Sequence, residues 1–102
     1  ILVSAGFDAH WQDPLAMGGL SLTGYAGITR KLLSYANQLC EDRILFILEG
    51  GYHHEVLTAS VVNVFHALLD HDEILDPIGP MPRSEHDIEA LVERLKAHYL
   101  LK

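Results

Sequence analysis

The chain has 102 residues and carries 7 Lys and Arg against 14 Asp and Glu, a formal net charge of −7 with histidine neutral. This length allows one domain at most, and the hydrophobic fraction of 49% excludes an intrinsically disordered or collagen-like chain. The acidic balance argues against nucleic acid or an anionic membrane as the main partner. The single cysteine, Cys40, excludes an internal disulfide. No apolar run approaches the ~20 residues of a membrane span, and no signal peptide is expected.

Two short apolar runs predict β-strands, one from Ile1 to Ala5 and one from Ile44 to Leu48. Neither run alternates with polar residues, which is typical of parallel strands that are covered on both faces. The first run lies at the very start of the chain, without an initiator Met. We therefore expect the chain to be a piece of a longer protein.

Three amphipathic segments predict helices. Thr23 is expected to cap a helix that runs to about Gln38, and a second helix is expected over residues 55–69. Ser84 and Asp87 resemble a capping box that opens a third. The apolar positions expected to pack are, in turn, Tyr25, Ile28, Leu32, Tyr35 or Ala36, and Leu39; Leu57, Val61, Val64, Phe65 and Leu68; and Ile88, Leu91, Val92, Leu95 and Tyr99.

The predicted order of strand, helix, strand, helix, helix indicates an α/β fold. Two parallel strands are too few for a stable sheet, so further strands must come from elsewhere. We expect residues 1–102 to form the C-terminal part of a single domain. Residues 1–69 would hold the strands and two helices, residues 70–83 a Pro-rich loop, and residues 84–102 the last helix.

Polar residues follow both predicted strands. Asp8 comes soon after the first strand, and Glu49, Gly50, Gly51 and Tyr52 follow the second. In open α/β sheets, ligands bind beyond the carboxyl ends of the strands, so Asp8 and Tyr52 would face one cleft if the strands are neighbours. A carboxylate in that position is costly to bury unless a metal or a hydrogen-bond donor compensates it. The glycine pair would allow the backbone to approach a ligand closely.

Each of these residues also has a purely structural interpretation. Asp8 could cap the following turn. Tyr52 could be an ordinary half-buried ring. Asp8 and His10 have the spacing of two metal ligands on an extended segment, but an isolated pair of this kind is more often accidental. Cys40 is more easily explained as a small buried residue than as a nucleophile.

Longer motifs around these residues resemble a known family. The segment from Ser4 to His10, Asp13-Pro14-Leu15, the segment from Gly19 to Thr23, and the later segment from Leu48 to Tyr52 resemble the histone deacetylase superfamily, in particular its class II-like and bacterial branch with the acetylpolyamine amidohydrolases. The resemblance covers residues 1–69. It implies the C-terminal portion of a three-layer, parallel-sheet arginase/deacetylase-like fold. The link over residues 15–19 is longer than is usual in the family.

The resemblance also implies roles for individual residues. It makes Asp8 a ligand of a catalytic Zn²⁺, and makes Tyr52 the residue that polarises the acyl carbonyl and stabilises the oxyanion. Gly50 and Gly51 would line the acyl pocket. His10 matches a position that is not a ligand. The family's two other zinc ligands and its histidine pair belong to motifs that this sequence does not contain.

The implied function is that of a zinc-dependent amide hydrolase, which removes an acetyl group from an N-acetylated amine such as acetyl-lysine of histones or other proteins, or an acetylpolyamine. The 102-residue chain alone is expected to be inactive and to associate with itself. The expected location is cytoplasmic, or nuclear in a eukaryote. Two alternatives remain: a non-catalytic α/β interaction domain, and an inactive relative that binds acylated ligands.

Overall fold

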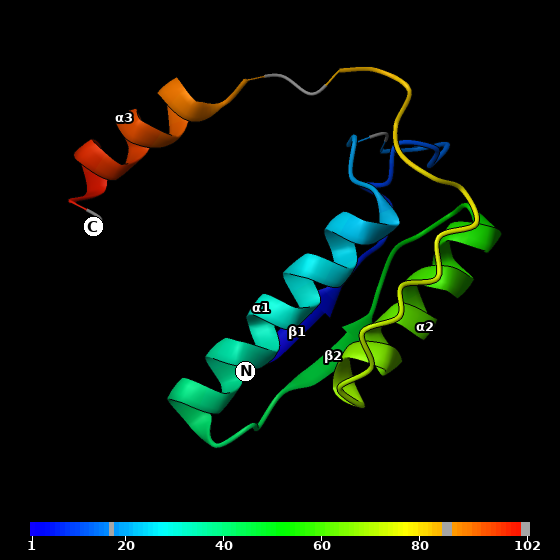
Figure 1. Cartoon of the computed structure of the whole chain (residues 1–102), viewed down its shortest axis with the longest axis horizontal. Coiled ribbons are helices and arrows are strands. Elements are labelled where there is room, and N and C mark those ends of the chain that lie inside the picture. Colours follow the sequence, from blue (N-terminus) through cyan, green and yellow to red (C-terminus); the bar gives the residue numbers. More distant parts are fainter. Residues whose placement is uncertain (17, 85–86, 101–102) are drawn as a thin grey trace.

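The computed structural model describes residues 1–16, 18–84 and 87–100, and Figure 1 shows the arrangement of its elements. The predicted order of elements is confirmed. The elements are β1 (Leu2–Ala5), α1 (Leu22–Cys40), β2 (Leu45–Leu48), α2 (His54–Leu68) and α3 (Glu89–Tyr99). Within the described residues, no helix is both long enough and apolar enough to span a bilayer.

The two strands are paired neighbours, as expected. They run parallel, with Leu2 opposite Leu45 and Ala5 opposite Leu48. Further bonds continue the pairing beyond the strand ends, and at the carboxyl end the Glu49 N–H donates to the Ala5 carbonyl at 3.1 Å. The loops that follow β1 and β2 therefore begin side by side.

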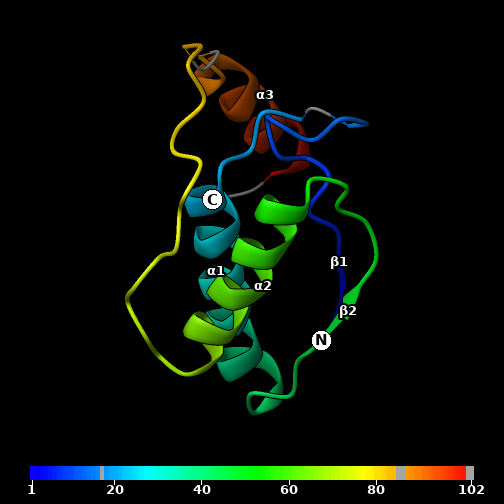
Figure 2. The same cartoon turned by 90° about the vertical axis from the view of Figure 1, so that its right-hand side faces the viewer.

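Helices α1 and α2 lie on the same side of the strand pair, which is clearest in Figure 2. The predicted burial of the strands on both faces is wrong for this chain. The side chain of Leu2 is 76% exposed, and Leu45 and Ile47 on the same face are also exposed. The reason is that the described part of the chain places no layer over that face.

The helices pack against each other through smaller residues than the sequence pattern indicates. The buried positions are Leu22, Tyr25, Ala26, Thr29 and Ala36 of α1, and Val56, Ala59, Ser60, Asn63 and Ala67 of α2. Several of the large residues expected in the core are exposed instead, including Ile28, Leu39 and Phe65. Small side chains allow two helices to approach closely, so the larger ones are left to face the strands or solvent.

The first helix begins earlier than expected. Its N-cap is Ser21, whose hydroxyl accepts the Gly24 N–H at 3.1 Å, so the prediction of Thr23 as the cap is wrong. Thr23 instead shares a hydrogen bond with the Ser21 hydroxyl at 2.8 Å.

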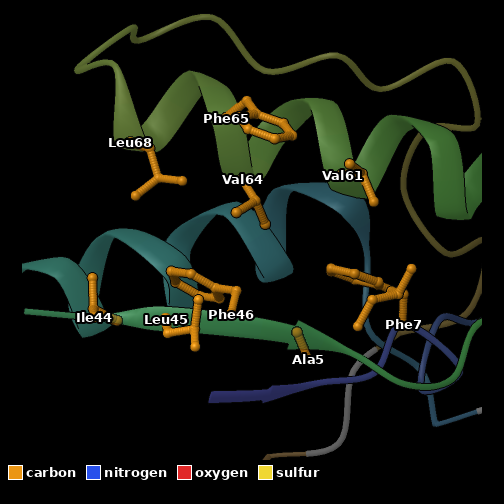
Figure 3. Close-up of a pocket in the computed structure, with 10 residues that line it drawn as sticks. Ala5, Phe7, Ile44, Leu45, Phe46, Val61, Val64, Phe65 and Leu68 are labelled. Carbon is orange, nitrogen blue, oxygen red and sulfur yellow. The ribbon is translucent and has the colours of Figure 1, made fainter. Parts of the chain in front are cut away.

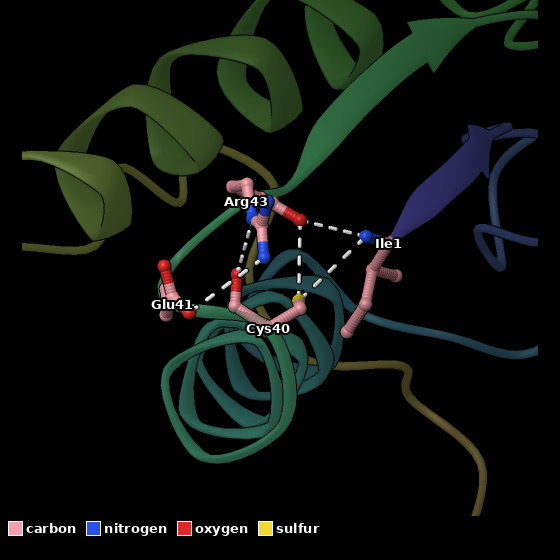
Figure 4. Close-up of polar contacts among 4 residues, drawn as sticks. All are labelled: Ile1, Cys40, Glu41 and Arg43. Atoms are coloured by element: carbon pink, nitrogen blue, oxygen red, sulfur yellow. Dashed lines mark hydrogen bonds and ion pairs between the residues drawn. The ribbon is translucent and has the colours of Figure 1, made fainter.

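A short turn connects α1 to β2 (Figure 4). Glu41 ends the helix in a left-handed conformation, with φ of 54°. The Arg43 guanidinium donates through Nε to the Cys40 carbonyl at 3.0 Å, and the Ile1 nitrogen donates to the Arg43 carbonyl at 2.6 Å. Cys40 is half-buried and its thiol lies in this turn. The turn thus holds the start of β1 beside the approach to β2.

The third helix is separate from the rest of the fold and makes no contact with the other helices or strands (Figure 1). It begins at Glu89, so the prediction of a capping box at Ser84 is wrong. Asp87 accepts the Glu89 N–H at 2.9 Å instead, and residues 85 and 86 lie outside the described part. Its apolar residues Leu91, Leu95 and Tyr99 are exposed.

Candidate functional site

The structure brings Asp8 and the glycine pair together at the carboxyl ends of the strands. A Cβ atom on Gly50 would lie 3.1 Å from Asp8 Oδ2 and 3.2 Å from its Cγ. A Cβ on Gly6 would lie 3.3 Å from Asp8 Oδ1. The carboxylate therefore sits against two stretches of backbone that lack side chains. Gly50 makes room for Asp8, a role that the sequence did not reveal.

The second glycine is required by its backbone conformation. Gly51 has φ of 137°, which residues with a side chain rarely adopt. A Cβ there would also lie 3.2 Å from Leu57 Cδ1 and 3.3 Å from Phe7 Cβ. Beside it, the Phe7 N–H donates to the Gly50 carbonyl at 2.9 Å and ties the two loops together. This glycine sets the path by which the chain reaches Tyr52.

Tyr52 lies where the loop after β2 turns toward α2. Its side chain is 52% exposed, and no described residue makes a hydrogen bond with its hydroxyl. Its backbone, in contrast, is held firmly, because the Tyr52 N–H donates to Asp13 Oδ2 at 2.9 Å. The phenol is thus free to meet a ligand while the main chain that carries it is fixed.

Asp13 is the site residue that sequence reasoning missed, because it was read only as part of a loop signal. The residue is buried, with 1% of its surface exposed. Oδ1 accepts the N–H groups of Leu15 at 2.8 Å and Ala16 at 3.2 Å, while Oδ2 accepts that of Tyr52. An Asp before Pro commonly bonds to the next backbone N–H groups, so the local part could be predicted. The bond to Tyr52 has no local signal.

The pKa of Asp13 reflects these bonds. Burial by itself raises the pKa of a carboxyl group, but N–H donors from Tyr52, Leu15, Ala16 and His53 outweigh it, so the Asp13 pKa lies below its ordinary value of 3.8. Asp13 is therefore an ionised carboxylate at neutral pH. Hydrogen bonds to a charged acceptor are stronger than neutral ones.

The long link over residues 15–19 does not prevent the two ends of its loop from pairing. The Leu20 N–H donates to the Ala9 carbonyl and the Trp11 N–H to the Leu20 carbonyl, each at 2.9 Å. These two hydrogen bonds join the start of the loop, at Ala9 and Trp11, to its end at Leu20. Gly18 packs so closely on Ala9 that a Cβ on it would lie 2.9 Å from Ala9 Cβ. Residue 17 lies outside the described part.

His10 lies between Ala9 and Trp11, where the two ends of the loop pair, and is 0% exposed. Its Nδ1 accepts the Gln12 N–H at 3.1 Å, and its ring stacks on Trp11 with centroids 5.7 Å apart. Burial lowers the pKa of His10 below its ordinary value of 6.5, against an opposing effect of Asp76. The imidazole is thus neutral and is used to order the loop.

The aromatic residues beneath the site pack edge to face. The rings of Phe7 and Tyr25 have centroids 5.2 Å apart and planes inclined by 68°. Burial raises the pKa of Tyr25 to about 12, so its phenol stays protonated at physiological pH. This aromatic pair packs next to the loop that carries Asp8.

The described residues do not form a complete metal site by themselves. No group of three His, Cys, Asp or Glu side chains among them could hold a metal ion. The Asp8 carboxylate is half-buried and accepts no hydrogen bond from a described residue, so its oxygens are available to a cation. A hard carboxylate oxygen suits Zn²⁺ as one ligand of several.

A separate cavity of about 330 Å³ lies between the strands and α2 (Figure 3). Its lining is wholly apolar and includes Phe46, Val64 and Phe65. Because it contains no titratable side chain, it is unsuited to hydrolysis. The polar candidate residues lie instead in the loops that follow the two strands.

A sequence profile of the histone deacetylase domain matches residues 1–68. The chain belongs to the histone deacetylase family. The chain is 43% identical over 74 residues to "Histone deacetylase 14, chloroplastic" of Arabidopsis thaliana, in a match covering 72% of the chain and 18% of that relative. It is 33% identical over 103 residues to "Histone deacetylase 6" of Caenorhabditis elegans, covering 97% of the chain and 10% of the relative.

The fold also matches a solved deacetylase. The crystal structure of the HDA15 HD domain superposes with a TM-score of 0.65 and 32% identity, over 98% of this chain and 25% of that one. The predicted arginase/deacetylase-like fold is confirmed, with this chain representing a partial α/β portion of it. The chain spans 18% or less of the curated relatives named above.

Proposed function

We propose that this chain is part of a zinc-dependent deacetylase that hydrolyses an N-acetylated amine, either the acetyl-lysine of a histone or other protein or an acetylpolyamine. The observation that carries the proposal is the contact of Asp8 with the loop from Gly50 to Tyr52, at the carboxyl ends of two parallel strands. This contact places a free carboxylate close to the loop that presents an exposed phenol. Amide hydrolysis needs both a metal ligand and an oxyanion donor.

Asp8 serves in this proposal as one ligand of the zinc. A bound zinc with an open position would activate water and polarise the acyl carbonyl. The family resemblance supplies the other ligands, an aspartate and a histidine, from motifs outside this sequence. Gly50 supports the assignment. Because it has no side chain, the Asp8 carboxylate can pack against its backbone while the carboxylate oxygens stay available to a metal.

Tyr52 donates a hydrogen bond from its hydroxyl to the acyl oxygen. The bond strengthens as negative charge develops on that oxygen, which lowers the barrier rather than merely binding the substrate. The exposure of the ring is compatible with this role, because it leaves the hydroxyl accessible to a substrate. Gly50 and Gly51 line the acyl pocket with backbone.

The test is Asp8→Ala in the full-length protein. Loss of one of three protein ligands should remove most of the zinc and nearly all deacetylation of an acetyl-lysine peptide and an acetylpolyamine. Asp72→Ala is the matched control, since Asp72 is exposed and far along the chain, after α2. Metal analysis and steady-state kinetics give the two readouts.

The possible outcomes separate the proposal from its alternatives. Full zinc occupancy and normal turnover in Asp8→Ala would exclude Asp8 as a ligand. A full-length protein that binds an acetylated peptide but never turns it over would be an acyl-ligand-binding relative instead. The preferred substrate of the two identifies the amine carrier.

A further inference from the structure

A buried carboxylate connects the two halves of the site. Asp13 lies in the loop after β1 and Tyr52 in the loop after β2, and they are 39 residues apart in sequence. Their bond, with Asp13 Oδ2 and the Tyr52 nitrogen 2.9 Å apart, is the only side-chain bond among described residues that reaches Tyr52. Asp13 is therefore placed to determine where the Tyr52 main chain lies.

The Asp13 side chain is itself rigidly oriented. Its other oxygen accepts two N–H groups of its own loop, from Leu15 and Ala16. These bonds leave Oδ2 turned toward the neighbouring loop. A charged acceptor that receives several N–H donors and has almost no exposure to water holds its geometry well.

Tyr52 needs such an anchor because little else fixes it. It lies outside the helices and strands, one residue after Gly51 with its φ of 137°. Its ring is half-exposed, so side-chain packing constrains it weakly. A displacement of about 1 Å in a catalytic group can lower a rate by roughly 10²-fold.

We propose that Asp13 is a positioning residue for Tyr52: its carboxylate holds the Tyr52 backbone so that the phenol remains directed at the reacting carbonyl. This inference rests on the role proposed for Tyr52. It makes Asp13 act through the tyrosine and not on the substrate itself.

The experiment is a double-mutant cycle in the full-length protein, with an acetyl-lysine peptide as substrate. Asp13→Asn keeps the size of the side chain but removes its charge and one of its acceptor oxygens. We expect kcat to fall by about 10-fold or more while KM changes little, because the lost geometry matters in the transition state. In the Tyr52→Phe background, the same substitution should lower kcat by no more than about threefold.

Amide hydrogen exchange provides a readout that is independent of turnover. The Tyr52 amide should exchange slowly in the wild type and faster in Asp13→Asn, because its acceptor is weakened. Asp13→Glu, which keeps the charge but is one methylene longer, takes the place of Asp13→Asn in the cycle if the latter does not fold.

Asn63→Asp is the matched control. Asn63 is also buried and anchors a loop, exchanging hydrogen bonds with the Leu75 backbone at 2.7 and 2.9 Å, but it does not bond to Tyr52. The Asn63→Asp substitution should lower the thermal stability, but it should leave kcat and the hydrogen-exchange rate of the Tyr52 amide unchanged.

The outcomes distinguish the inference from the function on which it rests. If Tyr52→Phe lowers kcat but Asp13→Asn costs the same factor with and without the hydroxyl, Asp13 acts elsewhere and the inference is overturned. If Tyr52→Phe leaves kcat unaltered, the proposed role of the tyrosine fails, and the inference falls with it.

Discussion

Gly50 shows how one missing side chain can hold a site open. A Cβ on Gly50 would lie 3.1 Å from Asp8 Oδ2 and 3.2 Å from its Cγ, which is closer than ordinary van der Waals contact. A side chain at this position would therefore displace the Asp8 carboxylate by a few tenths of an ångström. The constraint acts on the geometry of a candidate ligand and not on the stability of an element.

Gly50→Ala should therefore weaken metal binding in the full-length protein. We expect the zinc affinity to fall by about 10–100-fold, as for other changes that displace a ligand without removing it. Gly27→Ala is the control, because Gly27 is an exposed position of α1 and a Cβ there would meet nothing within 4 Å. That variant should gain roughly 0.5–1 kcal/mol of stability and keep its zinc. Zinc retention against a chelator and thermal unfolding measure both. Equal zinc affinity in the two variants would contradict the argument.

Asp13 gives the fold a defined response to acid. Because its pKa is lowered in the folded state, the ionised form stabilises the fold above the ordinary value of 3.8, and that stabilisation is lost as pH falls through the lower folded-state pKa. The stability advantage of the wild type over Asp13→Asn should be constant from pH 7 to about 4 and shrink below it. Urea unfolding at a series of pH values tests this. An advantage that grows on acidification would contradict it.

The residues of the site differ in how far sequence could predict them. Asp8 and Tyr52 each lie a few residues after an apolar run, and the pairing of those runs brings their loops together as expected. The Asp13–Tyr52 bond could not be predicted, because it depends on how two loops meet in space. The metal and oxyanion roles of Asp8 and Tyr52 stay predictions.

At the scale of elements, position along the chain was predicted well and the packed faces were not. Hydrophobic periodicity located α1 and α2 to within a few residues, but it favoured large side chains such as Ile28 and Phe65 for the core. The helix pair is instead closed by small residues such as Ala59 and Ala67. Periodicity shows which residues are apolar, whereas the choice of neighbour determines which of them are buried.

The start of α1 offers a direct test at this scale. Ser21→Ala should destabilise the full-length protein by about 1 kcal/mol, because the Gly24 N–H loses its acceptor. Thr23→Ala removes only the hydroxyl partner of Ser21 and should cost less. Chemical denaturation of both variants decides between the two residues. A larger loss for Thr23→Ala would restore it as the cap.

The whole molecule exposes surfaces that a stable monomer would cover. One face of the strand pair is open, the apolar cavity between β2 and α2 is accessible, and α3 stands apart. Unpaired strand edges and large apolar patches recruit other chains. The 102-residue chain spans a quarter of the matched deacetylase domain, so the rest of such a domain is the natural cover.

The isolated 102-residue polypeptide should therefore self-associate and show no deacetylase activity. Its described residues provide Asp8 and Tyr52 but no three-ligand metal cluster. Leu2→Lys, on the open face of β1, should reduce the association because it places a charge on the exposed strand. Light scattering and a zinc-supplemented deacetylation assay are the measurements. A compact wild-type monomer, or turnover above background, would contradict the prediction.

The pairing of β1 with β2 has a consequence for the order in which the site comes into being. Two hydrogen bonds that fix the strand pair and the loops after it join residues far apart in sequence. Ile1 and Arg43 are 42 residues apart, and Asp13 and Tyr52 are 39 residues apart. Helices form within about a microsecond. Contacts of this separation form later, because the entropy cost of closing the long loop is met before the contacts stabilise the chain. A refolding chain acquires the helical signal of α1 and α2 before it acquires a site. Recovery of the functional fold is thus best followed at Tyr52 and not by helical circular dichroism.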